Sequence, residues 1–281
     1  MTSWNGLAIA ALARTSAALR STSPELALVY LESAKNAAQF IKTNLYNSTT
    51  NTLKRVFLDG PGDTDGFSDD YAFLISGLIE LYQATFDSEY LQWADTLQQT
   101  QIKLFWDDKA GGFFRTSASA DVILRLKDDG DSAEPSANSV SSRNLLRLGS
   151  LLSNRSYDEK AIETCQAFSE ELEKQPWAVP SMLMSVVGGL EGVRQIVVAG
   201  KKQHEMTAKF LNEIWGRLLV NTVVIHLDPE SRDEWILSRN EVLHEVLKIP
   251  SPEGIPFVTI CEGYTCGLPI RDVENLSTVL K

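Results

Sequence analysis

The chain is short of the residues that hold a fold together covalently or through a metal. Its 281 residues include three cysteines and three histidines. Three cysteines in a chain of this length do not form a disulfide framework. No apolar run approaches the ~18 residues that a membrane span requires. A hydrophobic content of 43% with 22% charged residues is typical of a globular domain with an ordinary core, so we expect no membrane association.

Basic residues are scarce as well. Lysine and arginine number 26 against 37 acidic residues, which leaves a net charge of −11 and no basic stripe. This balance argues against a nucleic-acid partner, because the phosphate backbone is bound by clustered cations. The chain also lacks a Ser-His-Asp signature, a phosphate loop and a dinucleotide fingerprint. We therefore expect neither a cofactor nor a metal.

Acidic residues are absent from residues 1–24, which carry Arg14 and Arg20. This composition is compatible with a mitochondrial targeting peptide, although it has no basic start of the kind that a secretory signal shows. We favour an ordinary core helix, because the segment is in register with a repeat described below. A cytoplasmic protein is expected, with a mitochondrial location as the alternative.

A repeat of helix starts is the most informative feature that the sequence does contain. Trp4, Asp69 and Glu134 are spaced 65 residues apart, and each opens a polar cluster ahead of an apolar run. A second offset, of 60 residues, carries Arg55 onto Arg115. A period of this size corresponds to one helical hairpin with its connection, and repeated hairpins bring equivalent helix ends to one side. The three polar clusters are therefore predicted to line one mouth.

The apolar patterns predict a mainly α fold. Residues 69–86 are apolar all round and residues 88–105 are amphipathic, so we expect inner helices in a ring that outer helices wrap. A short strand around 53–58 and a small hairpin over 106–126 are expected between helices. The expected helices cover about 4–20, 25–45, 69–86, 88–105, 135–152, 156–174 and 179–191.

The pattern changes after residue 192. Apolar runs rich in β-branched residues, at 194–199, 219–227 and 257–261, alternate with helical stretches at about 203–216 and 232–247. This succession is typical of a small α/β element with some parallel strand pairing. We therefore divide the chain into a helical portion, residues 1–192, and a small C-terminal α/β element, residues 193–281.

An ordered set of motifs resembles a known family. The motifs are Trp4-Asn5-Gly6, Gly66-Phe67-Ser68-Asp69-Asp70-Tyr71-Ala72, Trp106-Asp107 with Gly111-Gly112-Phe113-Phe114, Lys127-Asp128-Asp129 with Asp131, Glu134-Pro135-Ser136-Ala137-Asn138-Ser139, and Cys261-Glu262 with Cys266. From about residue 2 to its end, the chain is similar in this order to the spermatogenesis-associated protein 20 family. Members of that family resemble a thioredoxin-like domain followed by an α/α toroid of the six-hairpin glycosidase type, related in shape to sugar 2-epimerases.

Two departures limit what this resemblance implies. The chain lacks the thioredoxin-like part and has no Cys-x-x-Cys, so it resembles only the C-terminal portion of the family. It also contains about three and a half hairpins, where a closed toroid needs about six. We therefore expect an incomplete α/α toroid, with the thioredoxin-like half of the family as one possible partner and a small carbohydrate as the other.

Carboxylates at the predicted mouth are the candidates for catalysis. Asp70 and Glu134 are proposed as the acid–base pair, because glycoside hydrolysis needs two carboxylates and epimerisation needs a proton donor and acceptor. Aromatic faces and amides around them are suited to sugar C–H surfaces and hydroxyls. The candidate substrate-binding residues are Trp4, Asn5, Asp69, Tyr71, Lys127, Asp131 and Asn138.

Each of these residues also has a purely structural interpretation. Asp69, Asp70 and Glu134 stand where a side chain caps a helix and meets its dipole. Asn138 falls inside a packed helix, where a buried amide must be hydrogen-bonded, in the site or locally. The acidic loop around Lys127 and Asp131 is either a solvated loop or a rim of the mouth, since it lacks the ligand pattern of a calcium site.

Cys261 and Cys266 frame the segment Glu-Gly-Tyr-Thr. Two reduced thiols, a reversible disulfide and half of a zinc site are all compatible with this spacing. Because the family resemblance includes the pair, both cysteines are kept as redox candidates.

Two functions remain open from sequence. The first is a carbohydrate-active toroid that resembles sugar epimerases or glycosidases. The second is a non-catalytic module that binds a ligand or partner and serves a thioredoxin-like redox regulator. No histidine precedes His204, which argues against the mechanism of toroidal epimerases, since the resemblance implies histidines in the ring. A third interpretation is a truncated product without activity of its own, whose exposed half-ring would aggregate.

Overall fold

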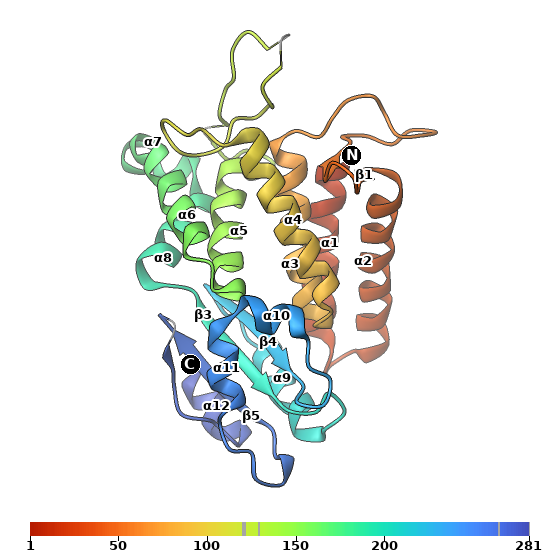
Figure 1. The fold of residues 1–281 in the computed structure, drawn as a ribbon, viewed down its shortest axis with the longest axis vertical. Helices are drawn as coiled ribbons and strands as arrows, with labels where there is room; N and C mark the ends of the chain where they lie inside the picture. Colours follow the sequence, from red (N-terminus) through yellow and green to blue (C-terminus); the bar gives the residue numbers. More distant parts are fainter. Residues whose placement is uncertain (120–121, 129, 264, 281) are drawn as a thin grey trace.

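The computed structural model describes residues 1–119, 122–128, 130–263 and 265–280. Its first part is an array of antiparallel helical hairpins (Figure 1). These are α1 (Thr2–Leu19), α2 (Pro24–Asn44), α3 (Ser68–Thr85), α4 (Ser88–Phe105), α5 (Ala137–Leu152), α6 (Arg155–Ala167), α7 (Ser169–Lys174) and α8 (Pro180–Glu191), with a short 3-10 turn at Pro176–Ala178. The predicted hairpins are therefore present with nearly the expected bounds, except that the helix expected over 156–174 is divided into α6 and α7.

The first helices of the hairpins form the inner layer of this array. α1 packs against α3, and α3 packs against α5. α2, α4 and α6 cover these three helices from outside, each against its own hairpin partner, while α8 packs against α5 and α6. Among the residues of α3, only Asp69, Ser76 and Thr85 are not buried, as its apolar sequence predicts. The mainly α fold, an incomplete toroid of helical hairpins followed by a small α/β element, is confirmed.

Two glycines allow α1 and α3 to touch through their backbones. A Cβ atom on Gly6 would lie 2.5 Å from the backbone nitrogen of Leu74, and one on Gly77 would lie 2.7 Å from the carbonyl oxygen of Gly6. Real Cβ atoms do not approach other atoms this closely, so only glycine fits at either position. This contact sets the distance between the starts of α1 and α3.

The connections between helices are less regular than the sequence predicts. β1 (Tyr46–Asn47) and β2 (Thr52–Leu53) form a short antiparallel pair, which replaces the longer strand expected around 53–58. The strands expected within 106–126 are wrong, because Trp106 and Phe113 form only an isolated bridge. Ile123 and Leu124 are exposed, so the segment has no buried apolar face to hold a second strand. Residues 120 and 121 of this segment lie outside the described residues.

The C-terminal part is a four-stranded sheet with helices. β3 (Arg194–Ala199) pairs in parallel with β4 (Thr222–Leu227) and antiparallel with β5 (Phe257–Glu262), which pairs with β6 (Thr265–Cys266). The predicted parallel pairing is thus confirmed. α9 (Glu205–Trp215) connects β3 to β4. The remaining helices are α10 (Glu234–Arg239), α11 (Glu241–Leu247) and α12 (Val273–Val279), with a 3-10 turn at Pro252–Gly254.

The sheet lies across one end of the helical array (Figure 1). One face packs on α9 and α12 through Ile196, Val198 and Phe210. Residues of the other face, including Val197 and Ile225, belong to the same apolar cluster as the inner helices. The division into two units at residue 192 stays a prediction. No helix within the described residues is both long and apolar enough to cross a membrane.

Candidate functional site

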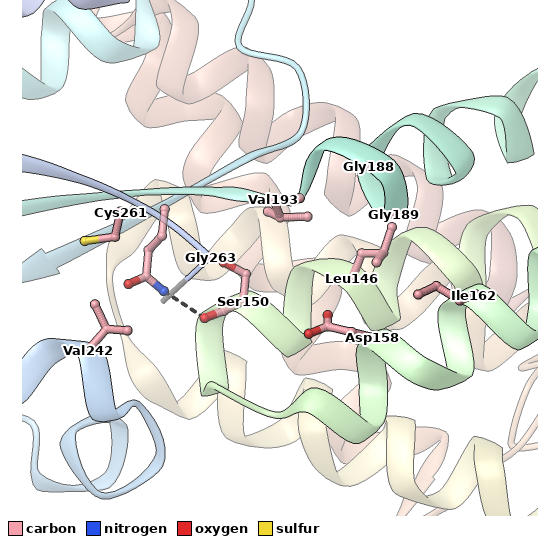
Figure 2. A pocket seen from close by; sticks show the side chains of 12 residues that line it. Leu146, Ser150, Asp158, Ile162, Gly188, Gly189, Val193, Val242, Cys261 and Gly263 are labelled. Atoms are coloured by element: carbon pink, nitrogen blue, oxygen red, sulfur yellow. Dashed lines mark hydrogen bonds between the residues drawn. The ribbon is translucent and has the colours of Figure 1, made fainter. Parts of the chain in front are cut away.

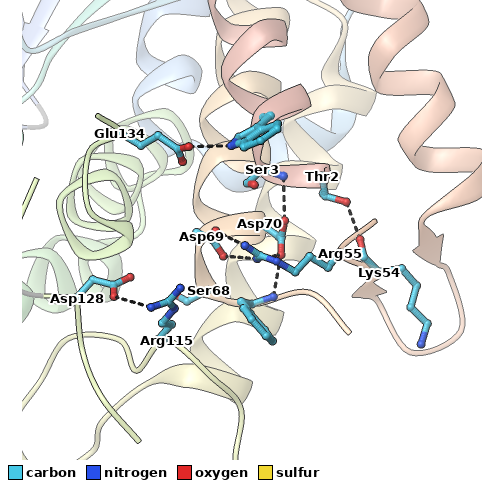
Figure 3. Close-up of polar contacts among 12 residues, drawn as sticks. Thr2, Ser3, Lys54, Arg55, Ser68, Asp69, Asp70, Arg115, Asp128 and Glu134 are labelled. Atoms are coloured by element: carbon cyan, nitrogen blue, oxygen red, sulfur yellow. Dashed lines mark hydrogen bonds and ion pairs between the residues drawn. The ribbon is translucent and has the colours of Figure 1, made fainter. Parts of the chain in front are cut away.

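The starts of α1, α3 and α5 meet at the end of the array opposite the sheet, as the 65-residue repeat predicts. The backbone N–H of Ser3 donates to Oδ1 of Asp70 at 2.9 Å, which joins the starts of α1 and α3. The indole Nε1 of Trp4 donates to Oε1 of Glu134 at 2.7 Å, which joins α1 to the segment entering α5. Figure 3 shows these contacts around the carboxylates. The three polar clusters therefore do form one mouth.

Asp70 lies at the bottom of this mouth and is completely buried. Its Oδ2 accepts from the backbone N–H of Phe67 at 2.9 Å, which forms the reciprocal half of a capping box at the start of α3. The same oxygen is 2.7 Å from Nη1 of Arg55. Burial, and to a smaller extent the charge of Asp69, raise the pKa of Asp70 to about 6, against the opposing effects of the Phe67 N–H and Arg55. Both of its oxygens are therefore occupied by contacts within the protein.

Arg55 links the two neighbouring aspartates. Its guanidinium makes two contacts with Asp69, at 2.9 and 3.2 Å, in addition to the contact with Asp70. It also lies over the ring of Phe67, 4.5 Å from the ring centroid. The sequence analysis did not assign Arg55 to the site, although the 60-residue offset that pairs it with Arg115 contained the signal.

A cavity of about 300 Å³ opens beside this cluster. Asp69 and Glu134, both predicted site residues, line it together with Arg115 and Asp128. Arg115 and Asp128 face each other at 3.9 Å (Figure 3). Phe73 contributes an apolar wall, and the segment 130–137 closes the other side. Trp4 is 57% exposed and is held at the cavity through its bond to Glu134. Carboxylates from two helix starts, an arginine and an exposed indole thus share one opening.

Two predicted site residues are buried away from the cavity. The hydroxyl of Tyr71 accepts from the backbone N–H of Leu53 at 3.0 Å, and burial raises the pKa of Tyr71 to about 12. Asn138 makes two hydrogen bonds with the backbone of Phe113, at 2.7 and 3.0 Å. Both side chains fasten a connection to the helical array, which is the local alternative that the sequence left open for Asn138.

The remaining predicted residues of the mouth bind the protein itself. Asn5 donates to the carbonyl of Met1 at 2.7 Å. Lys127 pairs with Asp107 at 2.8 Å, next to Gly111. Asp131 accepts from the backbone N–H groups of Ser136 and Ser181, both at 2.7 Å, so one carboxylate joins the starts of α5 and α8. The predicted rim residue Asp129 lies outside the described residues.

Cys261 and Cys266 are joined as a disulfide between β5 and β6. Of the alternatives that the spacing allows, the structure therefore shows the disulfide. Cys261 also lines a second cavity, of about 180 Å³, between α5, α8 and the sheet (Figure 2). Gln195 spans part of that cavity and donates to the carbonyl of Ser150 at 2.7 Å. Within the described ranges, no group of three or more histidine, cysteine or acidic side chains is arranged to hold a metal ion.

The free energy of unfolding of the wild type is expected to fall relative to that of Asp70→Asn as the pH rises from about 4 through about 6, because Asp70 then loses its proton. The folded pKa is about 6 against an ordinary value of 3.8, so the folded state holds the proton more tightly than the unfolded chain. This stabilisation is complete below the unfolded pKa and is lost as the pH rises through the folded pKa. The difference in pKa corresponds to about 3 kcal/mol.

Urea unfolding of both proteins between about pH 4 and pH 7 measures this effect. The free energy of unfolding of the wild type minus that of Asp70→Asn should decline across the range. Asp108→Asn, at an exposed position, is the control and should leave the pH dependence unchanged. A wild-type advantage that stays constant with pH would contradict the prediction.

Comparison with known proteins gives the same answer as the motifs. No family model matches the chain. Spermatogenesis-associated protein 20 of Homo sapiens aligns with the whole of this chain, over 290 aligned residues, at 35% identity. The Mus musculus protein aligns over the same length at 36% identity. The chain is similar to spermatogenesis-associated protein 20 throughout its length. The resemblance predicted from the motifs is thus confirmed.

The relatives are much longer than this chain. The chain spans 36% of the human spermatogenesis-associated protein 20 and 35% of the mouse protein, and corresponds to their C-terminal part. An uncharacterized protein of Caenorhabditis elegans is 32% identical over 98% of this chain, which spans 37% of that protein. Among solved structures, a GH76 alpha-mannanase from Bacteroides thetaiotaomicron matches 66% of this chain and 50% of its own, with a TM-score of 0.49 and 17% identity.

Proposed function

We propose that the cavity at the helix starts binds a carbohydrate and that its carboxylates carry out acid–base chemistry on it. The observation that supports this is the meeting of Asp69 and Glu134, from two different helix starts, in one cavity of about 300 Å³. Two carboxylates across a substrate are what glycoside hydrolysis requires. The exposed indole of Trp4 supplies an aromatic face of the kind on which sugar rings stack.

The residues of the mouth have distinct roles in this proposal. Glu134 reaches the cavity and is the group that exchanges a proton with substrate. Asp69 is the second carboxylate of the pair and faces Glu134 from the other helix start, held in place by Arg55. Asp70 is a positioning residue, because it is buried and holds Arg55 and the start of α1. Arg115 offers further donors to substrate oxygens.

A panel of mono- and disaccharides tests the proposal through thermal unfolding of the purified chain. A sugar at a hundred times its Kd stabilises the native state by about 2.7 kcal/mol. This corresponds to a rise in Tm of roughly 5 °C for a chain of this size. We expect such a rise for at least one sugar, and we expect Asp69→Asn and Glu134→Gln to abolish it. Asp108→Asn, which removes an exposed carboxylate outside the cavity, should retain it.

A sugar response that persists in both Asp69→Asn and Glu134→Gln would place binding elsewhere and overturn the proposal. A cooperative melt that no sugar shifts would favour the second candidate, a non-catalytic module that binds a partner such as a thioredoxin-like half. That candidate is supported by α2, at the edge of the array, where Leu28, Val29 and Phe40 are exposed.

A further inference from the structure

A third cavity, lined by several arginines, lies at the other end of the helices from the mouth, next to the sheet. It has a volume of about 270 Å³ and is formed where the second halves of α1, α3 and α5 meet β4 and the segment that precedes it. Four arginines line it, namely Arg14, Arg143, Arg147 and Arg217. Glu80 lies eleven positions after Asp69 along α3, which separates this cavity from the mouth by roughly 16 Å.

The charges around this cavity do not balance. Glu80 pairs with Arg14 and Arg147, each at 2.7 Å, and Glu213 pairs with Arg217 at 2.6 Å. Four guanidinium groups therefore face two carboxylates, although the chain as a whole has a net charge of −11. Such a local surplus of positive charge in an acidic protein needs an explanation.

Arg143 is the cation that the fold leaves uncompensated. No acidic side chain among the described residues pairs with it, whereas the other three arginines each have one. Burial, together with the neighbouring Arg147 and Arg14, lowers the pKa of Arg143 to about 10, and the charge of Glu80 only partly opposes this. It lies in the middle of α5, away from the C-terminal end at which the helix dipole would stabilise a cation. Neither an ion pair nor a helix end therefore accounts for this arginine.

Two neutral donors in the cavity also lack acceptors. The indole Nε1 of Trp215 and the amide Nδ2 of Asn221 are buried and make no hydrogen bond with any described residue. Both residues line the cavity. Buried donors are nearly always paired in native proteins, so two unpaired ones in the wall of the cavity mark a region whose polar groups are incompletely satisfied. Most of the other lining residues are apolar, Ala17, Leu146 and Val193 among them, and the remaining polar ones are Glu80, Gln83 and Thr222.

We infer that this cavity binds a small organic anion whose carboxylate or phosphate group contacts Arg143. Guanidinium groups bind both kinds of oxyanion through paired N–H donors. The apolar lining is suited to a short carbon skeleton. The volume lies near the lower end of the range for small-molecule sites, so the ligand is small.

Isothermal titration calorimetry and thermal unfolding test this inference on the whole chain. The probes are inorganic phosphate, phenyl phosphate and benzoate, with sodium chloride at matched ionic strength as the reference. We expect at least one probe to bind and to raise Tm above the chloride reference. Tighter binding of the phosphates than of benzoate would identify a phosphate ligand, and the reverse order would identify a carboxylate.

Arg143→Met removes the surplus charge with little change in volume. We expect at least a tenfold weaker affinity for the probe, and a Tm without probe equal to or above that of the wild type, because an unpaired buried charge is lost. A purely structural arginine would instead show a lower Tm. Arg232→Met, at an exposed position, should match the wild type in both measurements.

Asn221→Asp provides a second variant that tests the same cavity. It places a carboxylate of similar shape beside the arginines, so it should raise Tm and abolish probe binding. The inference is overturned if no probe binds the wild type more tightly than chloride does, or if both Arg143→Met and Asn221→Asp bind as the wild type does. Glu134→Gln should leave probe binding unchanged, which separates this site from the mouth.

Discussion

Replacing Glu80 with glutamine is expected to reduce the free energy of unfolding by about 3–5 kcal/mol, the cost of breaking a buried ion pair from one side. Glu80 is buried on α3 and pairs with Arg14 of α1 and Arg147 of α5. Burial alone would raise the pKa of Glu80, but Arg147 and Arg14 outweigh burial and hold the pKa below its ordinary value. The substitution would leave these two arginines and Arg143 together without a carboxylate in the cavity.

Urea unfolding at neutral pH measures this loss. Glu170→Gln is the matched control, because it breaks an exposed pair with Lys174 one turn apart on α7. Such pairs contribute at most about 0.5 kcal/mol. A Glu80→Gln variant no less stable than Glu170→Gln would show that this carboxylate does not hold the three inner helices together. Because the pKa of Glu80 is lowered by folding, its contribution should also fade as the pH drops below about 4.5.

Substituting alanine for Gly6 is expected to destabilise the fold strongly. The new Cβ would meet the backbone of Phe73 and Leu74 at 2.5–2.6 Å, and backbone atoms cannot rotate away as a side chain can. Overpacking in cores costs about 1–3 kcal/mol, and this contact belongs at the upper end of that range. The start of α1 must also shift, which displaces the backbone N–H of Ser3 from Asp70 and the indole of Trp4 from Glu134.

Gly189→Ala in α8 is the control for Gly6→Ala. A Cβ at Gly189 would meet only a side-chain atom of Ile162 at 3.7 Å, an ordinary contact. Alanine favours a helix over glycine by roughly 1 kcal/mol, so this variant should be as stable as the wild type or more stable. If thermal unfolding gives Gly6→Ala a Tm equal to that of Gly189→Ala, the close backbone contact between α1 and α3 is not required.

The helical part of the fold was predictable because its signals are local. Periodic apolar residues and polar starts at a 65-residue spacing indicate hairpins whatever lies around them. The same reasoning failed over residues 106–126, where a glycine-containing turn and two short apolar runs predict a hairpin. Strand formation depends on a partner and on burial, and Ile123 and Leu124 find neither.

The candidate site was predictable in place but not in the role of each residue. The repeat predicted that Trp4, Asp70 and Glu134 belong to one mouth, and hydrogen bonds join these helix starts. Sequence could not distinguish Asp69 from Asp70, because adjacent residues on a helix point about 100° apart and only packing decides which one is buried. It also could not assign Arg55, which reaches Asp69 and Asp70 across a connection.

Periodicity and order along the chain are enough to predict the hairpins, the α/β element after residue 192 and the end of the array at which the polar helix starts gather. They are not enough to predict which carboxylates reach solvent, that Cys261 and Cys266 are bonded, or that four arginines from α1, α5 and the segment after α9 surround one cavity. These outcomes depend on contacts between residues far apart in the sequence. Burial and net charge at such a contact are set by several elements together, so the sequence of one segment does not predict them.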